Sequence, residues 1–511
     1  MTDTAARLAG LTSWNSDWRG LKAVVLGLGV TGFSVADTLV ELGTEVLVLA
    51  SSAKSEQKQL LEVIAAGYFE GPLKTVPDEL AEFAPEVIVV SPGFHPDHPV
   101  LLWAAERGIS IWGDIELAWR VRDKVQPAAE WMLVTGTNGK TTTTQLTTHI
   151  LNADSRRAAA VGNIGIPVLD AVRYPAGFDV LVVELSSYQL HWLDRTAEGT
   201  LEPWAAVCLN LADDHLDWHG SFEAYRDAKA KVYTNTKIAA VYNRADEATR
   251  VMVEDAEVIE GCRAIGFGLD APGPSDFGLV DGILCDRAFL EERATTALEL
   301  ATTDDLVAAG LGAPHSIANV LAASALARSM GVAPGIIRDA MRTFKMDAHR
   351  TQVVATANGI SWIDDSKATN PHAANASLRA QPSVVWIVGG LLKGVDIDAL
   401  VASHAPRLRA AILIGVDREA LRSAFGRHAP EVAVYEVDET ETSRVMPSAV
   451  RLAAAAAETG DVVLLAPAAA SMDQFTDYAD RGSQFADAVL SHLEGLTDDD
   501  DEATGQPPAE S

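Results

Sequence analysis

Short apolar runs alternate with helix-like segments along almost the whole chain, and this alternation is what most constrains the fold. The run LKAVVLGLG, residues 21–29, is followed by the helix-like TGFSVADTLVELG and then by a second apolar run, TEVLVLA. The same order returns with WMLVTG from residue 131 and with VVWIVGG from residue 384. Strands that alternate with helices form mainly parallel sheets, so the sequence predicts an α/β protein.

The length of the chain predicts several domains. A chain of 511 residues, 48% of them hydrophobic, exceeds what one core usually organises. We expect a Rossmann-like N-terminal domain over residues 1–112, a central P-loop ATPase-like domain with a mostly parallel sheet over 113–347, and a second Rossmann-like domain over 348–495. Residues 496–511 contain four consecutive aspartates and end in TGQPPAES, and we expect a disordered acidic tail there.

Charge and cysteine content exclude several classes of protein. The net charge is -31 and no basic block offsets it, which argues against binding to nucleic acid or to an anionic membrane. Three cysteines, Cys208, Cys262 and Cys285, show no metal-binding spacing, as in proteins of a reducing compartment. No run approaches the ~18 apolar residues of a membrane span, and the N-terminus lacks a signal-peptide pattern, so we expect a soluble, cytoplasmic protein.

The string GTNGKTTT, residues 136–143, follows a predicted strand and precedes a predicted helix. The backbone N–H groups of such a loop and the helix N-terminus cradle phosphates, while Lys140 reaches the terminal phosphate. Thr141 is placed to contact a magnesium ion bound to the phosphates, or to cap the helix, or both. The loop differs from the common Walker pattern, because Val134 stands where that pattern has glycine. The predicted phosphate site comprises Gly136, Thr137, Asn138, Gly139, Lys140, Thr141 and Thr142.

A second glycine-rich turn, GLGVTG, spans Gly27 to Gly32. The acidic residue that holds a ribose in dinucleotide-binding folds is absent, because the second strand ends in Leu49, Ala50 and Ser51, and this argues against a hydride-transfer cofactor. Such a turn can instead hold the diphosphate of a nucleotide sugar, with further backbone donors from Ser91 to Gly93, or it can be a tight turn only.

Two residues at predicted strand ends are candidate metal ligands. Glu184 ends DVLVVE, and His215 lies in NLADDHLDWH, both next to the phosphate loop, where a divalent cation could bridge them. His215 and His219 are four residues apart, but neither an HExxH glutamate nor a cysteine accompanies them, so magnesium is favoured over zinc. The alternative is a solvated acidic loop.

Together these strings resemble the Mur ligase family, and the resemblance runs in order from about Leu21 to about Leu493. GTNGKTTT is shared with folylpolyglutamate synthases and other Mur ligases, whereas GLGVTG, SPG, ELSSYQL, DDSKATNP and LAPAAASMDQF together are similar to the D-glutamate-adding branch. The resemblance implies that ATP phosphorylates the carboxylate of UDP-N-acetylmuramoyl-L-alanine, after which the amine of D-glutamate attacks the acyl phosphate. It implies a role in cytoplasmic peptidoglycan precursor synthesis, and we expect a monomer.

The resemblance also implies roles for individual residues. Lys140, His215 and Lys229 would be catalytic, and two magnesium ions would be held by Thr141, Glu184, His215 and Lys229. Lys229, in YRDAKAKVY, would be carbamylated, with Lys231 as a second candidate and a surface helix lysine as the alternative. The ATP site would also include Asn319, Arg350, Asp365 and Lys367. The sugar-nucleotide site would include Val30, Thr31, Ser91, Pro92, Gly93 and Asn163. The D-glutamate pocket would include Thr369, Lys393, Ser471, Met472 and Tyr478.

The chain departs from the family pattern at three places. Ala50, Ser51 and Ser52 replace an Asp-Thr-Arg-like sequence, GGLLK replaces GGxGK, and Tyr478 stands where the pattern has phenylalanine. The first departure concerns the uridine contacts rather than the reaction. The alternatives left open are another Mur ligase or a folylpolyglutamate synthase, a nucleotide-binding switch or regulatory ATPase, and an NAD(P)-dependent oxidoreductase built on GLGVTG.

Overall fold

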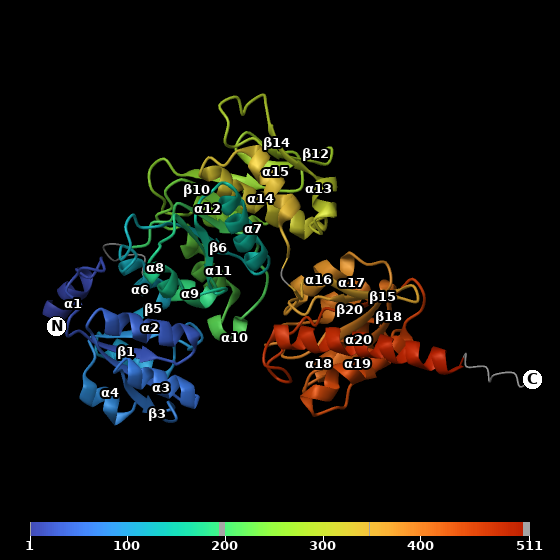
Figure 1. Cartoon of the computed structure of the whole chain (residues 1–511), viewed down its shortest axis with the longest axis horizontal. Helices are drawn as coiled ribbons and strands as arrows, with labels where there is room; N and C mark the ends of the chain where they lie inside the picture. Colours follow the sequence, from blue (N-terminus) through green and yellow to red (C-terminus); the bar gives the residue numbers. More distant parts are fainter. Residues whose placement is uncertain (1, 194–199, 347, 504–511) are drawn as a thin grey trace, which may run out of the picture. The chain divides into compact units, whose positions relative to one another are not determined.

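A computed structural model describes residues 2–193, 200–346 and 348–503 (Figure 1). The chain divides into two units, Met1–Leu211 with Ser221–Phe344, and Ala212–Gly220 with Lys345–Ser511. Three mainly parallel sheets, two in the first unit and one in the second, confirm the predicted three-domain α/β fold. The domain boundaries drawn from the sequence stay predictions.

The N-terminal sheet is fully parallel, with strand order β3-β2-β1-β4-β5. Its strands are β1 (Lys22–Leu26), β2 (Glu45–Ala50), β3 (Gly67–Glu70), β4 (Val87–Val90) and β5 (Ser110–Gly113). Its helices are α1 (Thr2–Ala9), α2 (Val30–Glu41), α3 (Ser55–Val63), α4 (Asp78–Phe83) and α5 (Pro99–Glu106). The strand order reverses between β1 and β4, and in open parallel sheets the crevice beyond such a reversal binds ligands.

The central sheet has the strand order β14-β13-β12-β11-β10-β9-β6-β8-β7, and its strands run parallel except for β13, which is antiparallel to both β12 and β14. Its strands are β6 (Glu130–Thr135), β7 (Ala158–Gly162), β8 (Val180–Glu184), β9 (Ala205–Cys208), β10 (Ala239–Asn243), β11 (Arg263–Phe267), β12 (Asp276–Val280), β13 (Ile283–Asp286) and β14 (Leu298–Thr302). Its helices are α6 (Asp114–Arg120), α7 (Lys140–Ala153), α8 (Val168–Arg173), α9 (Ser187–His191), α11 (Phe222–Ala230), η1 (Lys231–Tyr233), α12 (Glu247–Glu254), α13 (Thr303–Ala308), α14 (Pro314–Ser329) and α15 (Pro334–Thr343).

The second unit contains the C-terminal sheet, with strand order β15-β16-β20-β17-β18-β19. Its strands are β15 (Gln352–Ala357), β16 (Ile360–Asp364), β17 (Val384–Gly389), β18 (Leu408–Ile414), β19 (Ala433–Glu436) and β20 (Val462–Leu465). Its helices are α10 (Leu216–His219), α16 (Pro371–Arg379), α17 (Asp398–His404), η2 (Ala405–Arg407), α18 (Glu419–His428), α19 (Thr442–Ala456) and α20 (Tyr478–Ala503). Only β15 runs antiparallel to its neighbour in this sheet.

Buried apolar side chains form the cores that stabilise the three domains. One core includes residues of β1 and α2 in the N-terminal domain together with residues of β6, β8 and α8 in the central domain, so these two domains share a core. The C-terminal sheet has a separate core on each of its faces. Continuous burial of strands such as β4, β8 and β17 is what parallel strands covered on both faces require.

The C-terminal helix overlaps the predicted tail. Helix α20 continues to Ala503, past the predicted start of the tail at residue 496, and the disorder of the tail stays a prediction. The rest of the predicted tail, 504–511, lies outside the described residues.

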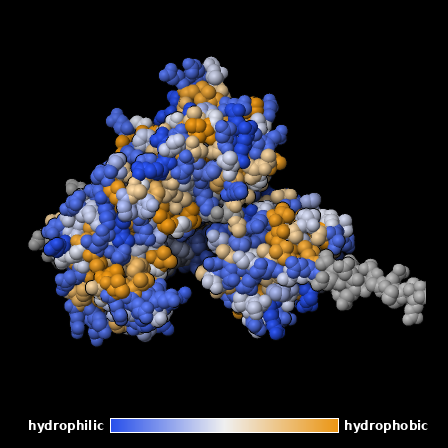
Figure 2. Space-filling view, in the orientation of Figure 1, coloured by the Kyte–Doolittle hydropathy of each residue, from blue (hydrophilic) through white to orange (hydrophobic). Residues whose placement is uncertain are grey.

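Polar side chains dominate one face of the molecule. Figure 2 shows a face on which hydrophilic side chains prevail and apolar ones gather in separate patches. Within the described residues, none of the helices combines the length and the apolar character needed to cross a bilayer.

Candidate active site

The predicted phosphate loop connects β6 to α7 and is held by Asn210, which follows β9. The backbone N–H of Thr137 donates to Asn210 O and that of Asn138 donates to Asn210 Oδ1, both at 2.9 Å. The Asn210 amide returns a bond to Asn138 O at 3.1 Å. Lys140 Nζ donates to the carbonyls of Gly136 and Thr137, each at 2.9 Å. Sequence reasoning missed Asn210, although a polar residue just after a buried strand is a usable signal.

Other groups approach the N-terminus of α7 closely, because a glycine precedes it. Gly139 precedes the helix with φ +83°, and a Cβ atom there would lie 2.3 Å from Asn319 Oδ1 on α14. The structure therefore brings Asn319 against the loop, as an ATP contact requires. Thr141 and Thr142 lie in the first turn and are buried. Gly139 provides no side-chain cap, so the first N–H groups of α7 suit an anion such as phosphate.

Glu184 ends β8 and is 2% exposed. Asn163 fixes one side of it, because Asn163 Nδ2 donates to Glu184 Oε1 at 3.0 Å and Asn163 N donates to Glu184 O at 2.9 Å. Glu184 Oε2 is buried and has no hydrogen-bond partner among the described residues. An unpaired buried carboxylate oxygen costs on the order of 1 to 3 kcal/mol or more. This oxygen therefore fits a cation ligand.

The residues of this site suit magnesium, which phosphates and water help to coordinate, better than a metal ion that protein side chains coordinate alone. The described part of the chain contains no group of three or more His, Cys, Asp or Glu side chains arranged for a metal ion. Magnesium is commonly held by one or two carboxylates together with substrate phosphates and water. Glu184, Thr141 and the phosphate loop match that kind of incomplete site.

Lys229 is buried beside the phosphate loop. It is 2% exposed, and its Nζ donates to Gly136 O at 2.8 Å and to Thr135 Oγ1 at 3.3 Å. The same Nζ lies 4.9 Å from the ring centroid of Tyr225. This burial excludes the alternative of a surface lysine on α11. Lys231 instead donates to His191 O and to Leu193 O, at 2.6 and 2.9 Å.

His215 belongs to the second unit, on the segment Ala212–Gly220. It precedes α10 with φ +54°, and its Nε2 lies 3.6 Å from Asp214 Oδ2.

A cavity of about 310 Å³ lies at the carboxyl edge of the N-terminal sheet. Its lining contains the predicted residues Val30, Thr31, Ser91 and Pro92, but not Gly93. It is lined by Gly27, Leu28, Gly29, Val30, Thr31, Gly32, Ala50, Ser51, Ser52, Ser91, Pro92 and Phe94.

Close backbone packing and unpaired donors shape this cavity. A Cβ atom at Gly32 would lie 2.1 Å from Gly27 O, so the turn requires glycine there. Gly29 precedes α2 without a side-chain cap, and Ser91 Oγ is buried with no hydrogen-bond partner in the described chain. The end of β2 contributes Ser51 and Ser52 rather than a carboxylate. The cavity can therefore accept an anionic group such as a diphosphate.

In the second unit, Asp365 lies just after β16 and is almost fully buried. Thr351 N donates to Asp365 Oδ1 at 3.1 Å, and Ser377 Oγ donates to Oδ2. Burial raises the pKa of Asp365 to about 6, against the lowering effects of Ser377, Thr351 and the charge of Arg350. The charge of Arg350 thus acts on Asp365 within the second unit. Their role in binding ATP stays a prediction.

The loop after β16 is fixed by a buried arginine that sequence reasoning missed. Arg481 on α20 donates from Nε to Ser366 Oγ at 3.0 Å and from Nη1 to Ala469 O at 3.1 Å. Burial lowers the pKa of Arg481 to about 10, although nearby carboxylates oppose this. Lys367, the next residue after Ser366, places its Nζ 3.5 Å from the ring centroid of Tyr478. These contacts bring Lys367 and Tyr478 together.

Two loops that carry predicted amino-acid contacts are joined directly. Leu391 and Ala470 exchange backbone hydrogen bonds of 2.9 and 3.0 Å. Lys393 lies two residues after Leu391 and has a φ of +54°. Ser471 comes directly after Ala470 and is buried. Met472 is 65% exposed. The structure thus places Lys393 and Ser471 on paired loops, and Thr369 on the loop after β16 that also carries Lys367.

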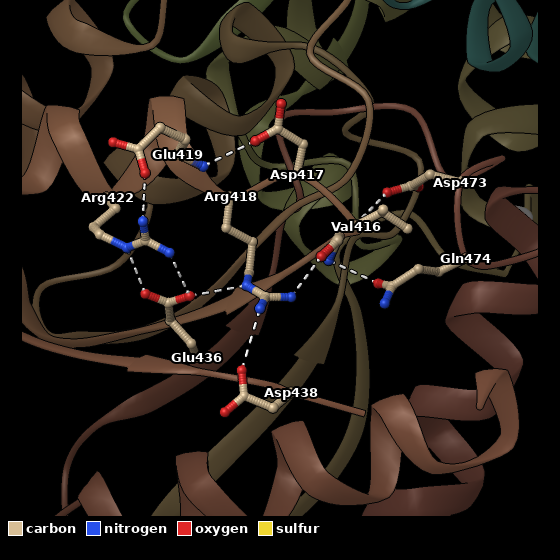
Figure 3. A network of polar contacts seen from close by, with 10 residues as sticks. Val416, Asp417, Arg418, Glu419, Arg422, Glu436, Asp438, Asp473 and Gln474 are labelled. Carbon is tan, nitrogen blue, oxygen red and sulfur yellow. Dashed lines mark hydrogen bonds and ion pairs between the residues drawn. The ribbon is translucent and has the colours of Figure 1, made fainter. Parts of the chain in front are cut away.

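The segment after Met472 is anchored to the loop between β18 and α18 (Figure 3). Asp473 Oδ2 accepts from Val416 N at 3.0 Å, and Gln474 Oε1 accepts from Gly415 N at 2.7 Å. Ser471 O in turn accepts from the backbone N–H of Gln474 at 3.1 Å. The backbone that presents Ser471 is therefore held on both sides.

Arg418 contacts the same loop and, together with Arg422, holds Glu436 (Figure 3). Arg418 donates to Gly415 O at 2.8 Å, to Glu436 at 3.0 Å and to Asp438 at 3.2 Å. Arg422 donates from Nε to Glu436 at 2.8 Å. The hydrogen bond from Arg422 lowers the pKa of Glu436 to about 2 against the opposing effect of burial, and the hydrogen bond from Arg418 adds to the lowering. The pair of arginines keeps Glu436 ionised and the loop in place.

Known proteins resemble this chain over its whole length. Family models match residues 21–113 (Mur ligase MurD-like, N-terminal domain), 134–327 (Mur ligase middle domain) and 349–469 (Mur ligase, glutamate ligase domain). The UDP-N-acetylmuramoylalanine--D-glutamate ligase of Leifsonia xyli subsp. xyli is 64% identical over 99% of each chain. The protein of that name from Streptomyces avermitilis is 50% identical over 93% of this chain and 99% of its own.

Solved structures show the same fold at low sequence identity. The UDP-N-acetylmuramate-alanine ligase MurC of Thermotoga maritima is 18% identical, with a TM-score of 0.54 over 92% of this chain and 100% of its own. MurF of Acinetobacter baumannii is 15% identical, with a TM-score of 0.53 over 92% of this chain and 91% of its own. The three matched domains and the 64% identical relative, together with the phosphate loop, lead to one conclusion: the chain belongs to the Mur ligase family.

Proposed function

We propose that the chain ligates D-glutamate to UDP-N-acetylmuramoyl-L-alanine with consumption of ATP, as a step of peptidoglycan precursor synthesis. The observation that carries the proposal is the buried Glu184 with its unpaired Oε2, in the domain that holds the phosphate loop. Such a carboxylate fits a metal-assisted phosphoryl transfer. The choice of substrates rests on the names of the 64% and 50% identical relatives.

In the first half-reaction, a carboxylate oxygen of the sugar nucleotide attacks the γ-phosphorus of ATP, and ADP leaves. The N-terminus of α7 and Lys140 would hold the phosphates, with Asn319 beside the loop. Glu184, Thr141 and His215 would hold magnesium, which neutralises charge on the transferring group when it is bound. Arg350, Asp365 and Lys367 would make further contacts with the nucleotide.

We propose that Lys229 works as a carbamate. Its Nζ attacks carbon dioxide and loses a proton, which turns a cation into an oxygen-bearing anion suited to a second magnesium ion. A buried lysine that otherwise donates to the carbonyl of Gly136 supports this role, because a charged ammonium is costly to bury.

The sugar nucleotide would bind in the cavity of the N-terminal domain. The uncapped N-terminus of α2 at Val30 and Thr31 suits its diphosphate, and the unpaired hydroxyl of Ser91 supplies a further donor. Pro92 and Gly93 continue this loop. Asn163, which fixes Glu184, would contact the other end of the substrate near the carboxylate.

In the second half-reaction, the amine of D-glutamate attacks the acyl carbon, phosphate leaves, and the amine loses a proton. Lys393 and Ser471, on paired loops, would bind the two carboxylates of D-glutamate, together with Thr369. Met472 and Tyr478 would line the pocket. A monomeric enzyme in the cytoplasm, where ATP is abundant, completes the proposal.

The direct test is product identification. Purified protein is incubated with ATP, magnesium, UDP-N-acetylmuramoyl-L-alanine and D-glutamate, and the products are analysed by mass spectrometry. We expect the sugar nucleotide to gain the mass of one glutamate residue, with one ADP formed for each product. Steady ADP formation without a ligated product would point instead to a regulatory ATPase. Sedimentation of the same sample tests the monomer.

A further inference from the structure

Polar contacts join the helix of the diphosphate cavity to the helix that follows the Asn163 loop. Ser34 on α2 donates to Asp170 Oδ1 on α8 at 2.5 Å. Arg173 on α8 donates from Nη2 to Asp37 Oδ2 at 2.6 Å and from Nη1 to Glu41 Oε2 at 3.1 Å, both on α2. One guanidinium therefore binds two carboxylates of the neighbouring domain.

Arg173 is shielded, which strengthens these contacts. Its side chain is 14% exposed, and it also contacts Asp170 Oδ1 at 3.2 Å. Burial favours protonation of Glu41, but bonds from Lys124 and Arg173 outweigh it and lower the pKa of Glu41. Ion pairs that are half-removed from solvent are stronger than fully exposed ones, which contribute little.

Apolar packing surrounds the same contacts. Val35 and Leu39 of α2 are buried in one core with Leu169 and Val172 of α8. The apolar contacts resist separation of the two helices but tolerate sliding, because the hydrophobic effect is not directional. The fork-shaped hydrogen bonds of Arg173 fix the position of one helix along the other.

Each of the two helices leads directly to a proposed end of the sugar-nucleotide site. The first turn of α2, with Val30 and Thr31, lines the cavity. Residues 164–167 are all that separate Asn163 from α8, and Gly162 N donates to Ile166 O at 3.4 Å, which keeps this loop tight. A shift of α8 along α2 is thereby passed to Asn163 and to Glu184.

We propose that Arg173 is a positioning residue that sets the distance between the diphosphate cavity and the Asn163–Glu184 pair. This inference rests on the proposed function, because the substrate must reach from one end to the other. A substrate with a fixed length gains binding energy from both ends only when their spacing matches. A ligand that occupies one end alone is indifferent to that spacing.

The test compares a ligand that spans both ends with one that fills only the cavity. Calorimetry measures the Kd of UDP-N-acetylmuramoyl-L-alanine and of UDP alone for wild type, Arg173→Met and Arg173→Lys. For Arg173→Met we expect the Kd of the full substrate to rise about tenfold, while that of UDP stays within about twofold. Arg173→Lys should recover part of the loss, because an ammonium still pairs with Asp37 or Glu41.

A matched control uses another arginine of the central domain. Arg157 pairs with Asp179 at 2.9 Å but is 55% exposed, and it does not contact α2 in the described structure. Arg157→Met should leave both Kd values unchanged. Asp37→Asn supplies a second variant, should Arg173→Met fold poorly, and it should weaken only the full substrate.

Three outcomes would overturn the inference. Unchanged affinity for the full substrate in Arg173→Met would exclude a positioning role. Equal losses for UDP and the full substrate would indicate general damage to the fold instead. An equal loss in Arg157→Met would assign the effect to net charge. Binding is measured without turnover, so failure to form a ligated product would count against the proposed function alone.

Discussion

Asn163 Nδ2 donates to Glu184 Oε1 at 3.0 Å, and the other oxygen of that carboxylate is buried with no partner in the described chain. The hydrogen bond fixes the orientation of the carboxylate before any ligand arrives. A site that is oriented in advance loses less entropy on binding its ligand. The reaction proposed for this chain depends on that unpaired oxygen.

Replacement of Glu184 by glutamine should lower turnover by about 100-fold or more, because a neutral amide cannot balance a divalent cation near the transferring phosphoryl group. The magnesium concentration that gives half-maximal rate should also rise. Both are measured by ADP release over a range of magnesium concentrations. Glu130→Gln, at the start of β6, is the control and should resemble wild type. Wild-type turnover in Glu184→Gln would place the metal elsewhere.

Lys140→Ala should lower turnover by roughly 100-fold or more, because the lysine offers a cation where negative charge develops during phosphoryl transfer. The KM for D-glutamate should change little, since Lys140 belongs to the phosphate loop alone. Steady-state kinetics with each substrate in turn checks this. Lys237→Ala, a half-buried lysine of the same domain, should retain activity. Near-normal turnover in Lys140→Ala would mean that ATP binds at another site.

Lys229→Ala should be inactive and should recover part of its activity in acetate or formate, which supply the missing carboxylate oxygens. Carbon-13-labelled bicarbonate should give a carbamate signal in the spectrum of the wild type that is absent from Lys229→Ala. Lys231→Ala, which removes a lysine that donates to the carbonyls of His191 and Leu193, should keep the signal. A wild type without the signal would contradict carbamylation.

The raised pKa of Asp114 predicts how the stability of the protein depends on pH. Burial raises its pKa from the ordinary 3.8 to about 6, against hydrogen bonds from Gln189 and the backbone. The folded state therefore binds the proton more tightly than the unfolded chain, so stability falls as pH rises through this window and is level above it. Asp114→Asn does not titrate and should stabilise the protein by about 2 to 3 kcal/mol near neutral pH, and by less near pH 5.

The measurement for Asp114 is thermal unfolding of wild type and Asp114→Asn at about pH 5 and about pH 7.5. A carboxylate of opposite behaviour is the control: hydrogen bonds from Arg342 and Thr302 lower the pKa of Asp305 to about 2. Asp305→Asn should therefore destabilise the protein at neutral pH, and the difference should shrink in acid. A destabilised Asp114→Asn at about pH 7.5 would show that the carboxylate charge is needed.

The sequence predicted most of what depends on local pattern. Apolar runs identify the buried strands, and GTNGKTTT and GLGVTG identify two turns, because glycine is required where Gly32 and Gly139 meet other groups closely. Asn319 could be placed near the phosphate loop only through the family resemblance. Its packing against Gly139 joins residues far apart in the sequence, which no local pattern reveals.

Long-range polar contacts explain what the sequence did not predict. Arg481, on the last helix, binds Ser366 and Ala469. In the sequence alone it looks like an ordinary exposed arginine on a helix. Asn210 holds the phosphate loop from the end of another strand. Lys229 is buried against the carbonyl of Gly136, which is far from it in the sequence. The local helix pattern therefore could not distinguish this lysine from one on the surface.

Selectivity for the amino acid tests the central claim most directly. D-glutamate brings two carboxylates to a chain of net charge -31, so specific donors must offset that charge. If Lys393 and Ser471 bind D-glutamate as proposed, loss of either would leave a carboxylate oxygen of the bound amino acid unpaired, at a cost on the order of 1 to 3 kcal/mol. The measurement is ligated product from D-glutamate, L-glutamate, meso-diaminopimelate and L-lysine, each titrated against wild type, Lys393→Ala and Ser471→Ala. We predict product from D-glutamate alone, and a KM for D-glutamate that rises about tenfold in both variants while the KM for ATP stays within about twofold. Better turnover with another amino acid, or equal losses for ATP and D-glutamate, would contradict the account.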